Sequence, residues 1–244
     1  MTAIETRQLT KRYGDLTAVD ALDLRVEAGT VYALLGVNGA GKTTTIKMLT
    51  GLIRPTSGDA YLAGHSIRTE NEKVREVTGV SPQETALAMH LTVRENLELM
   101  AGLYGRGRAS ARRAAEETMK KMSLSAYAEK QARTLSGGWQ RRLSIAMALI
   151  PEPEILFLDE PTLGLDVLAR RELWQVIRAL RGTATVVLTT HYLEEAEVLS
   201  DRIGIMAGGR LRAEGTTAEL LAFAEEKNFE DAFVKIAGGE VTGE

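Results

Sequence analysis

The chain of 244 residues contains no cysteine, which excludes a disulfide framework, a thiolate metal site and a cysteine nucleophile. Histidine is also scarce: His65, His90 and His191 are scattered, and their spacing matches no zinc motif. An excess of basic residues is absent, because 30 Lys and Arg stand against 33 Asp and Glu, a formal net charge of −3. This balance argues against nucleic acid as a partner.

Long hydrophobic runs are absent as well. The longest, such as Leu143–Ile150, stop far short of the ~18 residues that a membrane-spanning helix needs. The first ten residues, MTAIETRQLT, lack the basic-then-apolar layout of a signal peptide. We therefore expect a cytoplasmic chain whose membrane role, if it has one, comes through a partner.

Apolar runs of strand length alternate with helix-like stretches over most of the chain. Val31–Leu35 and Glu154–Asp159 are typical of strands buried on both faces, and Ala21–Val26 alternates as a half-buried strand does. Between residues 85 and 134 the composition shifts to good helix formers, with Val93 as the one β-branched aliphatic residue. The pattern predicts an α/β protein with a mainly parallel sheet and a helical insertion.

A glycine-rich segment, Gly36–Thr43 (GVNGAGKT), matches the phosphate-loop pattern G-x-x-x-x-G-K-[ST] in full. Its glycines let the backbone turn tightly and aim N–H groups at phosphate oxygens. Lys42 can reach the β- and γ-phosphates, and the hydroxyl of Thr43 can bind Mg²⁺. The apolar strand before the segment and the helix expected after it, from about Lys42 to Leu52, favour this interpretation over an ordinary glycine-rich turn.

Two acids end the second apolar strand, Asp159 and Glu160. Asp159 fits the Mg²⁺-side carboxylate of a P-loop enzyme. Glu160 is placed to orient or deprotonate an attacking water. Alone, the two acids could simply solvate the end of a strand. Together with the phosphate loop they predict nucleotide hydrolysis.

The motifs from Tyr13 to about Gly215 occur in the order found in the ATP-binding subunits of ABC transporters, and the chain resembles that family. The segment Leu135–Gln140 (LSGGWQ) resembles the ABC signature, which other P-loop proteins lack. In the family this segment closes over the γ-phosphate of the ATP bound by the opposite subunit. The resemblance gives this role to Ser136, Gly137 and Gly138. Trp139 stands where the family usually has glutamine.

Four further positions carry roles that the resemblance implies. Tyr13 fits the aromatic residue that stacks on adenine, and Gln83 looks like the Q-loop glutamine, which contacts Mg²⁺ or water and couples to the membrane subunit. Leu163–Asp166 resembles the D-loop at the subunit interface, although serine or alanine is more usual at its first residue. His191 looks like the switch histidine that touches the γ-phosphate.

ATP and Mg²⁺ are the ligands that the resemblance implies. We expect catalytic roles for Lys42, Glu160 and His191. Metal contacts are expected from Thr43, Gln83 and Asp159. Nucleotide contacts are expected from Tyr13, Gly36, Val37, Asn38, Gly39, Ala40, Gly41, Lys42, Thr43, Thr44, Gln83, Ser136, Gly137 and Gly138.

The resemblance also implies an architecture: a P-loop NTPase fold with a mainly parallel sheet, an N-terminal antiparallel β region and an inserted α-helical subdomain at about residues 85–150. The ATPase domain would span residues 1–225 and a short C-terminal extension residues 226–244. Thr189–Ala196 and Phe229–Lys235 are similar to segments of exporters whose membrane partner is an ABC-2 type permease. We expect two copies that sandwich ATP head to tail, held by the permease at the inner face of the cell membrane.

Two other functions are compatible with these motifs. A soluble ABC ATPase acting on DNA or the ribosome is the main alternative, but the helical insertion has no heptad run and the chain has room for one ATPase unit. An importer ATPase often carries a regulatory β-domain, and the roughly thirty residues after Gly215 are too few for one. The resemblance implies that selectivity for the transported substrate resides in the membrane partner and not in this chain.

Overall fold

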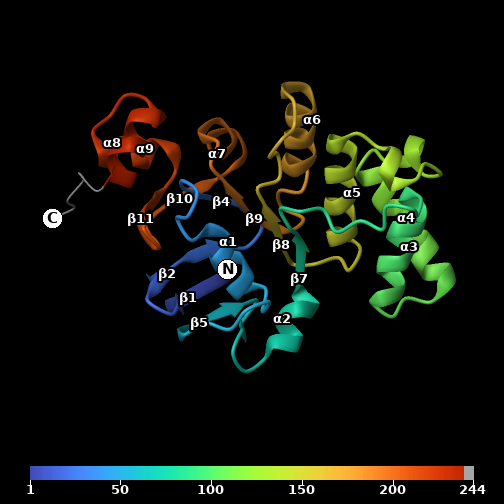
Figure 1. Ribbon diagram of the computed structural model, residues 1–244, viewed down its shortest axis with the longest axis horizontal. Helices are drawn as coiled ribbons and strands as arrows, with labels where there is room; N and C mark the ends of the chain where they lie inside the picture. Colours follow the sequence, from blue (N-terminus) through green and yellow to red (C-terminus); the bar gives the residue numbers. More distant parts are fainter. Residues whose placement is uncertain (239–244) are drawn as a thin grey trace.

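Two β-sheets form the framework of the protein in the computed structural model, which describes residues 1–238 (Figure 1). The larger sheet has the strand order β11-β10-β4-β9-β8-β7 and is parallel except for the β10–β11 pair. Its strands are β4 (Val31–Leu35), β7 (Thr78–Ser81), β8 (Ile155–Asp159), β9 (Thr185–Thr190), β10 (Arg202–Ala207) and β11 (Arg210–Gly215).

The smaller sheet is antiparallel and comes from the N-terminal part of the chain. Its strands are β1 (Thr2–Tyr13), β2 (Leu16–Leu22), β3 (Arg25–Glu27), β5 (Ser57–Leu62) and β6 (His65–Ser66). The antiparallel N-terminal region and the mainly parallel sheet agree with the architecture expected from the sequence.

Helices cover both faces of the larger sheet. Helix α1 (Lys42–Leu49) packs between the two sheets, and α2 (Asn71–Val77) leads into β7. The opposite face carries α6 (Val167–Arg178), α7 (Leu193–Leu199), α8 (Thr217–Ala224) and α9 (Phe229–Gly238). Three helices gather at the end of the molecule farthest from β11: α3 (Val93–Leu103), α4 (Arg108–Lys121) and α5 (Gly137–Leu149) (Figure 1). Over residues 1–238, no helix has both the length and the apolar character needed to cross a membrane.

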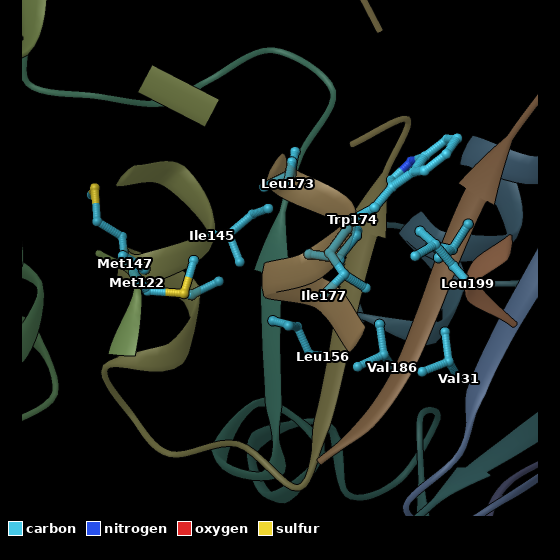
Figure 2. Close-up of a cluster of buried hydrophobic side chains, with 14 of the residues drawn as sticks. Val31, Met122, Ile145, Met147, Leu156, Leu173, Trp174, Ile177, Val186 and Leu199 are labelled. Carbon is cyan, nitrogen blue, oxygen red and sulfur yellow. The ribbon is translucent and has the colours of Figure 1, made fainter. Parts of the chain in front are cut away.

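Strand β4 separates two apolar clusters. Val31, Ala33 and Leu35 point into the first cluster, whereas Tyr32 and Leu34 point into the second, as the alternation of a strand requires. Figure 2 shows part of the first cluster, in which side chains of the parallel strands meet those of the covering helices: Val31, Leu156, Val186, Ile145, Leu173, Trp174, Ile177 and Leu199. The second cluster joins the larger sheet to α1 and the antiparallel sheet.

The sequence-based expectation of one strand over Ala21–Val26 is wrong, because the chain turns between β2 and β3. Ala21 has a φ of 46°, and the Thr6 hydroxyl donates to the Leu22 carbonyl and accepts from the Leu24 N–H, both at 2.7 Å. A side chain from β1 thus binds the backbone at this turn. Helices α2 and α8 were not predicted, and β1 was predicted only as part of the antiparallel N-terminal region, not as one long strand.

Helix α9 packs against the main body of the protein. Phe229, Ala232 and Ile236 are buried in the first apolar cluster, beside α8 and β10. These three residues recur at helical spacing, which is typical of a short helix packed along one face. The proposed division of the chain at residue 225 stays a prediction, and residues 239–244 of the expected extension lie outside the described residues.

Candidate functional site

The phosphate loop connects the end of β4 to the start of α1. Gly41, the residue before the helix, has a φ of 103°, a conformation that residues with a side chain rarely adopt. A Cβ atom there would lie 2.5 Å from the carbonyl oxygen of Ala18 on β2. The loop therefore needs glycine at this position for its conformation and for its close approach to the antiparallel sheet.

Lys42, the first residue of α1, turns its side chain back over the loop. Its Nζ donates to the carbonyl oxygens of Gly36 at 2.7 Å and Val37 at 3.3 Å. The same atom lies 3.3 Å from Oε1 of Glu160, and both side chains are buried. The cation is thus held inside the loop, next to the carboxylate that ends β8.

The hydroxyl of Thr43 faces the end of β8. It donates to Oδ1 of Asp159 at 3.1 Å, and the Thr189 hydroxyl donates to the same oxygen at 2.5 Å. Asp159 and Thr189 are register partners in the neighbouring strands β8 and β9. Parallel strands place their carboxyl ends at one edge of the sheet, which is why these groups converge.

Glu160 follows β8 in a left-handed backbone conformation, with a φ of 48°. Its N–H donates to the Thr189 hydroxyl at 2.9 Å, which helps to hold this conformation. Its Oε2 lies 2.8 Å from Nδ1 of His191, the residue after β9. The carboxylate therefore lies between an ammonium group, that of Lys42, and an imidazole ring.

A cleft of about 700 Å³ opens over these groups. Tyr13 stands at its wall, 49% exposed, with Nζ of Lys11 4.9 Å from the ring centroid. The residues expected at the site that line the cleft are Tyr13, Asn38, Gly39, Ala40, Gly41, Lys42, Thr43, Thr44, Gln83, Glu160 and His191. Their roles in binding and hydrolysis stay predictions, but the structure brings them together from distant parts of the chain.

The signature residues lie apart from this cleft. Ser136 precedes α5 as its N-cap residue, although its side chain accepts no capping hydrogen bond, and both Ser136 and Gly137 are exposed. Gly137 lines a separate hollow of about 420 Å³, which Gln83 and Leu165 also line. The P-loop and the signature of one chain therefore do not face one common cleft.

Trp139, which stands where the signature usually has glutamine, packs against Tyr127 and Arg142. Its ring centroid lies 4.2 Å from that of Tyr127, and the Arg142 guanidinium lies 4.4 Å from the centre of the indole ring. Arg142 also pairs with Glu172 of α6 at 3.2 Å. The tryptophan thus joins α5 to its neighbours.

Several contributors to the site were missed by sequence reasoning. The Thr189 hydroxyl donates to the Asp159 carboxylate and accepts from the Glu160 N–H, and the place of Thr189 shortly before His191 at the end of a buried strand could have indicated this role. The remaining wall of the cleft consists of Leu16, Thr17, Ala18, Leu163, Gly208 and Gly209. The two glycines form the turn between β10 and β11, which folds back on the P-loop: the Gly209 N–H donates to the Ala40 carbonyl.

A phosphate loop that opens a helix, with two acids at the end of β8, a parallel strand of the same sheet, defines a P-loop nucleotide-hydrolysing protein. Comparison with known protein families identifies which group of P-loop proteins this is. Residues 19–163 match the family model described as ABC transporter, and the chain belongs to the ABC transporter family as an ATP-binding ATPase.

Among curated relatives, the chain is 48% identical over 222 residues to the daunorubicin resistance ATP-binding protein DrrA3 of Streptomyces coeruleorubidus, a match that covers 91% of this chain and 70% of that protein. It is 41% identical over 246 residues to the probable multidrug ABC transporter ATP-binding protein YbhF of Escherichia coli, covering 96% of this chain and 42% of that protein. The chain thus spans less than half of the length of YbhF.

Solved structures agree on the fold. A structure described as an ATP-binding subunit of an ABC transporter has a TM-score of 0.84 at 29% identity, covering 96% of this chain and 99% of that one. A dimeric post-hydrolysis state of the ATP-binding cassette MJ0796, bound to ADP and Pi, has a TM-score of 0.78 at 28% identity, covering 87% of this chain and 98% of that one.

Proposed function

We propose that the chain is the ATP-hydrolysing subunit of a membrane exporter, working as a head-to-tail dimer with a separate permease of the ABC-2 type. The observation that carries the proposal is the convergence of Lys42, Thr43, Asp159, Glu160 and His191 at the carboxyl edge of the larger sheet. The drug-resistance names of DrrA3 and the multidrug name of YbhF support export. The permease would hold the subunit at the inner face of the cell membrane.

In this proposal the residues of the cleft have separate roles in nucleotide binding and hydrolysis. Lys42 and the P-loop N–H groups bind the β- and γ-phosphates, and Tyr13 stacks on adenine. Glu160 accepts a proton from the attacking water, and His191, which contacts Glu160, orients that carboxylate and meets the γ-phosphate.

The residues present fit a magnesium ion. The Thr43 hydroxyl and the Asp159 carboxylate meet at 3.1 Å and offer the hard oxygen ligands that Mg²⁺ prefers, with Gln83 at the same cleft. Among residues 1–238 no cluster of three or more His, Cys, Asp or Glu side chains could hold a metal by itself. A Mg²⁺ ion that is coordinated partly by phosphate oxygens needs no such cluster of side chains. When bound, it would neutralise charge on the phosphates.

A second copy completes the site. Ser136, Gly137 and Gly138 lie away from the P-loop of their own chain, as expected for groups that serve the nucleotide of a partner. The dimeric form of the similar cassette MJ0796 supports this arrangement. The alternative, a soluble ABC ATPase acting on DNA or the ribosome, is not favoured by relatives named for drug resistance.

The test is the substitution Glu160→Gln, with Glu154→Gln as the control. Glu154 is exposed at the opposite end of β8, so its substitution should leave hydrolysis unchanged. Glu160→Gln should retain ATP binding and lose about 10²- to 10⁴-fold in turnover, because only water activation is removed. It should also accumulate as an ATP-bound dimer, seen by mass. Normal turnover of this variant, or a wild type that neither binds nor hydrolyses ATP, contradicts the proposal.

A further inference from the structure

Arg141 is a buried arginine on α5, the helix that begins at the signature, and is 5% exposed. Its Nε donates to the carbonyl oxygen of Pro161 at 2.9 Å, and its Nη1 donates to that of Gln83 at 3.2 Å. Nη1 also donates to the carbonyl of Pro82, and Nη2 to that of Asp159. One guanidinium thus binds backbone from the Q-loop, the end of β8 and the segment after Glu160.

The partners of Arg141 are carbonyl groups, so an ordinary ion pair does not explain its burial. A guanidinium presents five N–H donors in a rigid fork, which lets one side chain bind several fixed acceptors at once. Burial lowers the pKa of Arg141 to about 10, and the group stays charged at neutral pH. Hydrogen bonds from a charged donor are strong, and their loss would leave the buried carbonyl groups of Asp159 and Pro161 without this partner.

A second contact joins the same face of α5 to the Q-loop. Oγ of Ser144 lies 2.9 Å from Oγ of Ser81, the last residue of β7. Residues 141 and 144 are three apart and so lie on one side of the helix. Helix α5 therefore fixes the end of β7 through Ser144 and the following two residues through Arg141.

We propose that Arg141 is a positioning residue of the ATPase site: it holds Gln83 and the Asp159–Glu160 segment in a fixed relation to each other and ties both to the signature helix. Arg141 itself does not line the P-loop cleft, so it acts through these segments. The inference rests on the proposed function, since it assigns a role within the same hydrolysis reaction. A shift of α5 on contact with a partner's nucleotide would move Gln83 and the catalytic acid together.

The experiment compares Arg141→Met and Arg141→Lys with Arg142→Met as the matched control. Arg142 is the next residue of the same helix and is also buried, but it pairs with Glu172 and stacks on Trp139. Arg141→Met should lower turnover by about 10²-fold, the effect of an ångström-scale misplacement of catalytic groups. KM for ATP should change little, because the P-loop is intact. The Mg²⁺ concentration for half-maximal activity should rise, because Gln83, an expected Mg²⁺ contact, is no longer held in place.

Arg141→Lys should recover only part of the turnover, because a single ammonium cannot reach all of the carbonyl partners. Arg142→Met should lower the melting temperature without changing the Mg²⁺ requirement. Melting temperature, measured for each variant, separates a loss of folding from a loss of positioning.

A double-mutant cycle with Gln83→Ala tests the connection directly. If Arg141 acts through Gln83, the factor by which Gln83→Ala lowers turnover should be smaller in the Arg141→Met background than in the wild type, by about twofold or more. Fully additive losses, an unchanged Mg²⁺ requirement, or failure of both Arg141 variants to fold would reduce Arg141 to a structural residue and overturn the inference. A wild type without ATPase activity would instead contradict the proposed function.

Discussion

Nζ of Lys42 lies 3.3 Å from Oε1 of Glu160, and the two side chains are only 6% and 7% exposed. The group proposed to bind phosphate and the group proposed to activate water are thus ion-paired in this structure. Each is also held by a second contact, Lys42 by the Gly36 carbonyl and Glu160 by His191. If these proposed roles hold, an entering γ-phosphate would give Lys42 an anionic partner that competes with Glu160 and would free the carboxylate for water.

Substitution of Lys42 by alanine removes the cation of this pair. ATP affinity should fall by about ten- to a hundredfold, the range for a lost hydrogen bond to a charged group, and hydrolysis should be abolished. Lys47→Ala is the control, because Lys47 lies on the same helix with its side chain exposed. Calorimetric titration with ATP and Mg²⁺ measures the affinity. Equal affinities for the two variants would remove Lys42 from the phosphate site.

Mixed dimers test whether the signature serves the opposite subunit. Lys42→Ala and Ser136→Arg homodimers should both be inactive, because every site in them carries a defect. In a mixed dimer one site collects both defects and the other is intact, so an equal mixture should regain roughly a quarter of the ATP sites. Heterodimers are confirmed by mass, and ATP binding and hydrolysis are then measured. Heterodimers without either activity would contradict the head-to-tail arrangement.

Gly41 provides a stability prediction for the P-loop. Gly41→Ala forces alanine to a φ of 103° and brings its Cβ to 2.5 Å from the Ala18 carbonyl oxygen. Strain and overpacking together should cost about 2 kcal/mol or more, which lowers the melting temperature by roughly 4–8 °C. Gly39→Ala is the control, since Gly39 has a φ of 83° with no atom within 4 Å of the added Cβ. Equal losses for the two variants would show that the Ala18 contact costs nothing.

The buried carboxyl group of Glu195 on α7 should make the free energy of unfolding depend on pH. The Thr162 hydroxyl and Trp174 Nε1 donate to its Oε1, whereas its buried Oε2 has no hydrogen-bond partner within the described part of the chain. Burial raises the pKa of the Glu195 carboxyl. The folded protein therefore holds this proton more tightly than the unfolded chain, and the free energy of unfolding falls as pH rises from the unfolded pKa through the folded one.

Glu195→Gln keeps the acceptor and removes the charge. The variant should be more stable than the wild type at pH 7, by on the order of 1 kcal/mol, and the difference should vanish at low pH where Glu195 is protonated. Thermal unfolding between pH 4 and about 8 measures this, with the exposed neighbour Glu194→Gln as the control. A constant difference across that range would show that the carboxyl does not titrate there.

The elements predicted best from the sequence are those with one dominant burial pattern. Val31–Leu35 was predicted with the bounds of β4, and Glu154–Asp159 differs from β8 by one residue. Helix α2 was missed because it buries only Val74, so it has no apolar periodicity to detect. Strand β1 was missed because it is interrupted by register shifts and by Gln8 at a φ of 50°.

Most residues of the candidate cleft could be named from the sequence because the P-loop, Gln83, the Asp159–Glu160 pair and His191 each lie at the end of a strand of the larger sheet. Their convergence depends on the strand order β4-β9-β8, which aligns Leu35 with Thr190 and Thr189 with Asp159. The contacts of Arg141 were not predictable, because its partners are backbone carbonyls whose directions are fixed only by tertiary structure.

Strand β4 contributes to both apolar clusters, and this sharing couples the two halves of the molecule. If either the antiparallel sheet or the helical layer separated from β4, one face of β4 would be exposed to water. The other layer, which packs on the opposite face of the same strand, would then lose its support. Partial unfolding of one layer is therefore costly, and residues 1–238 should unfold as one cooperative unit. The P-loop begins where β4 ends, so the cleft should keep its shape until the whole unit unfolds.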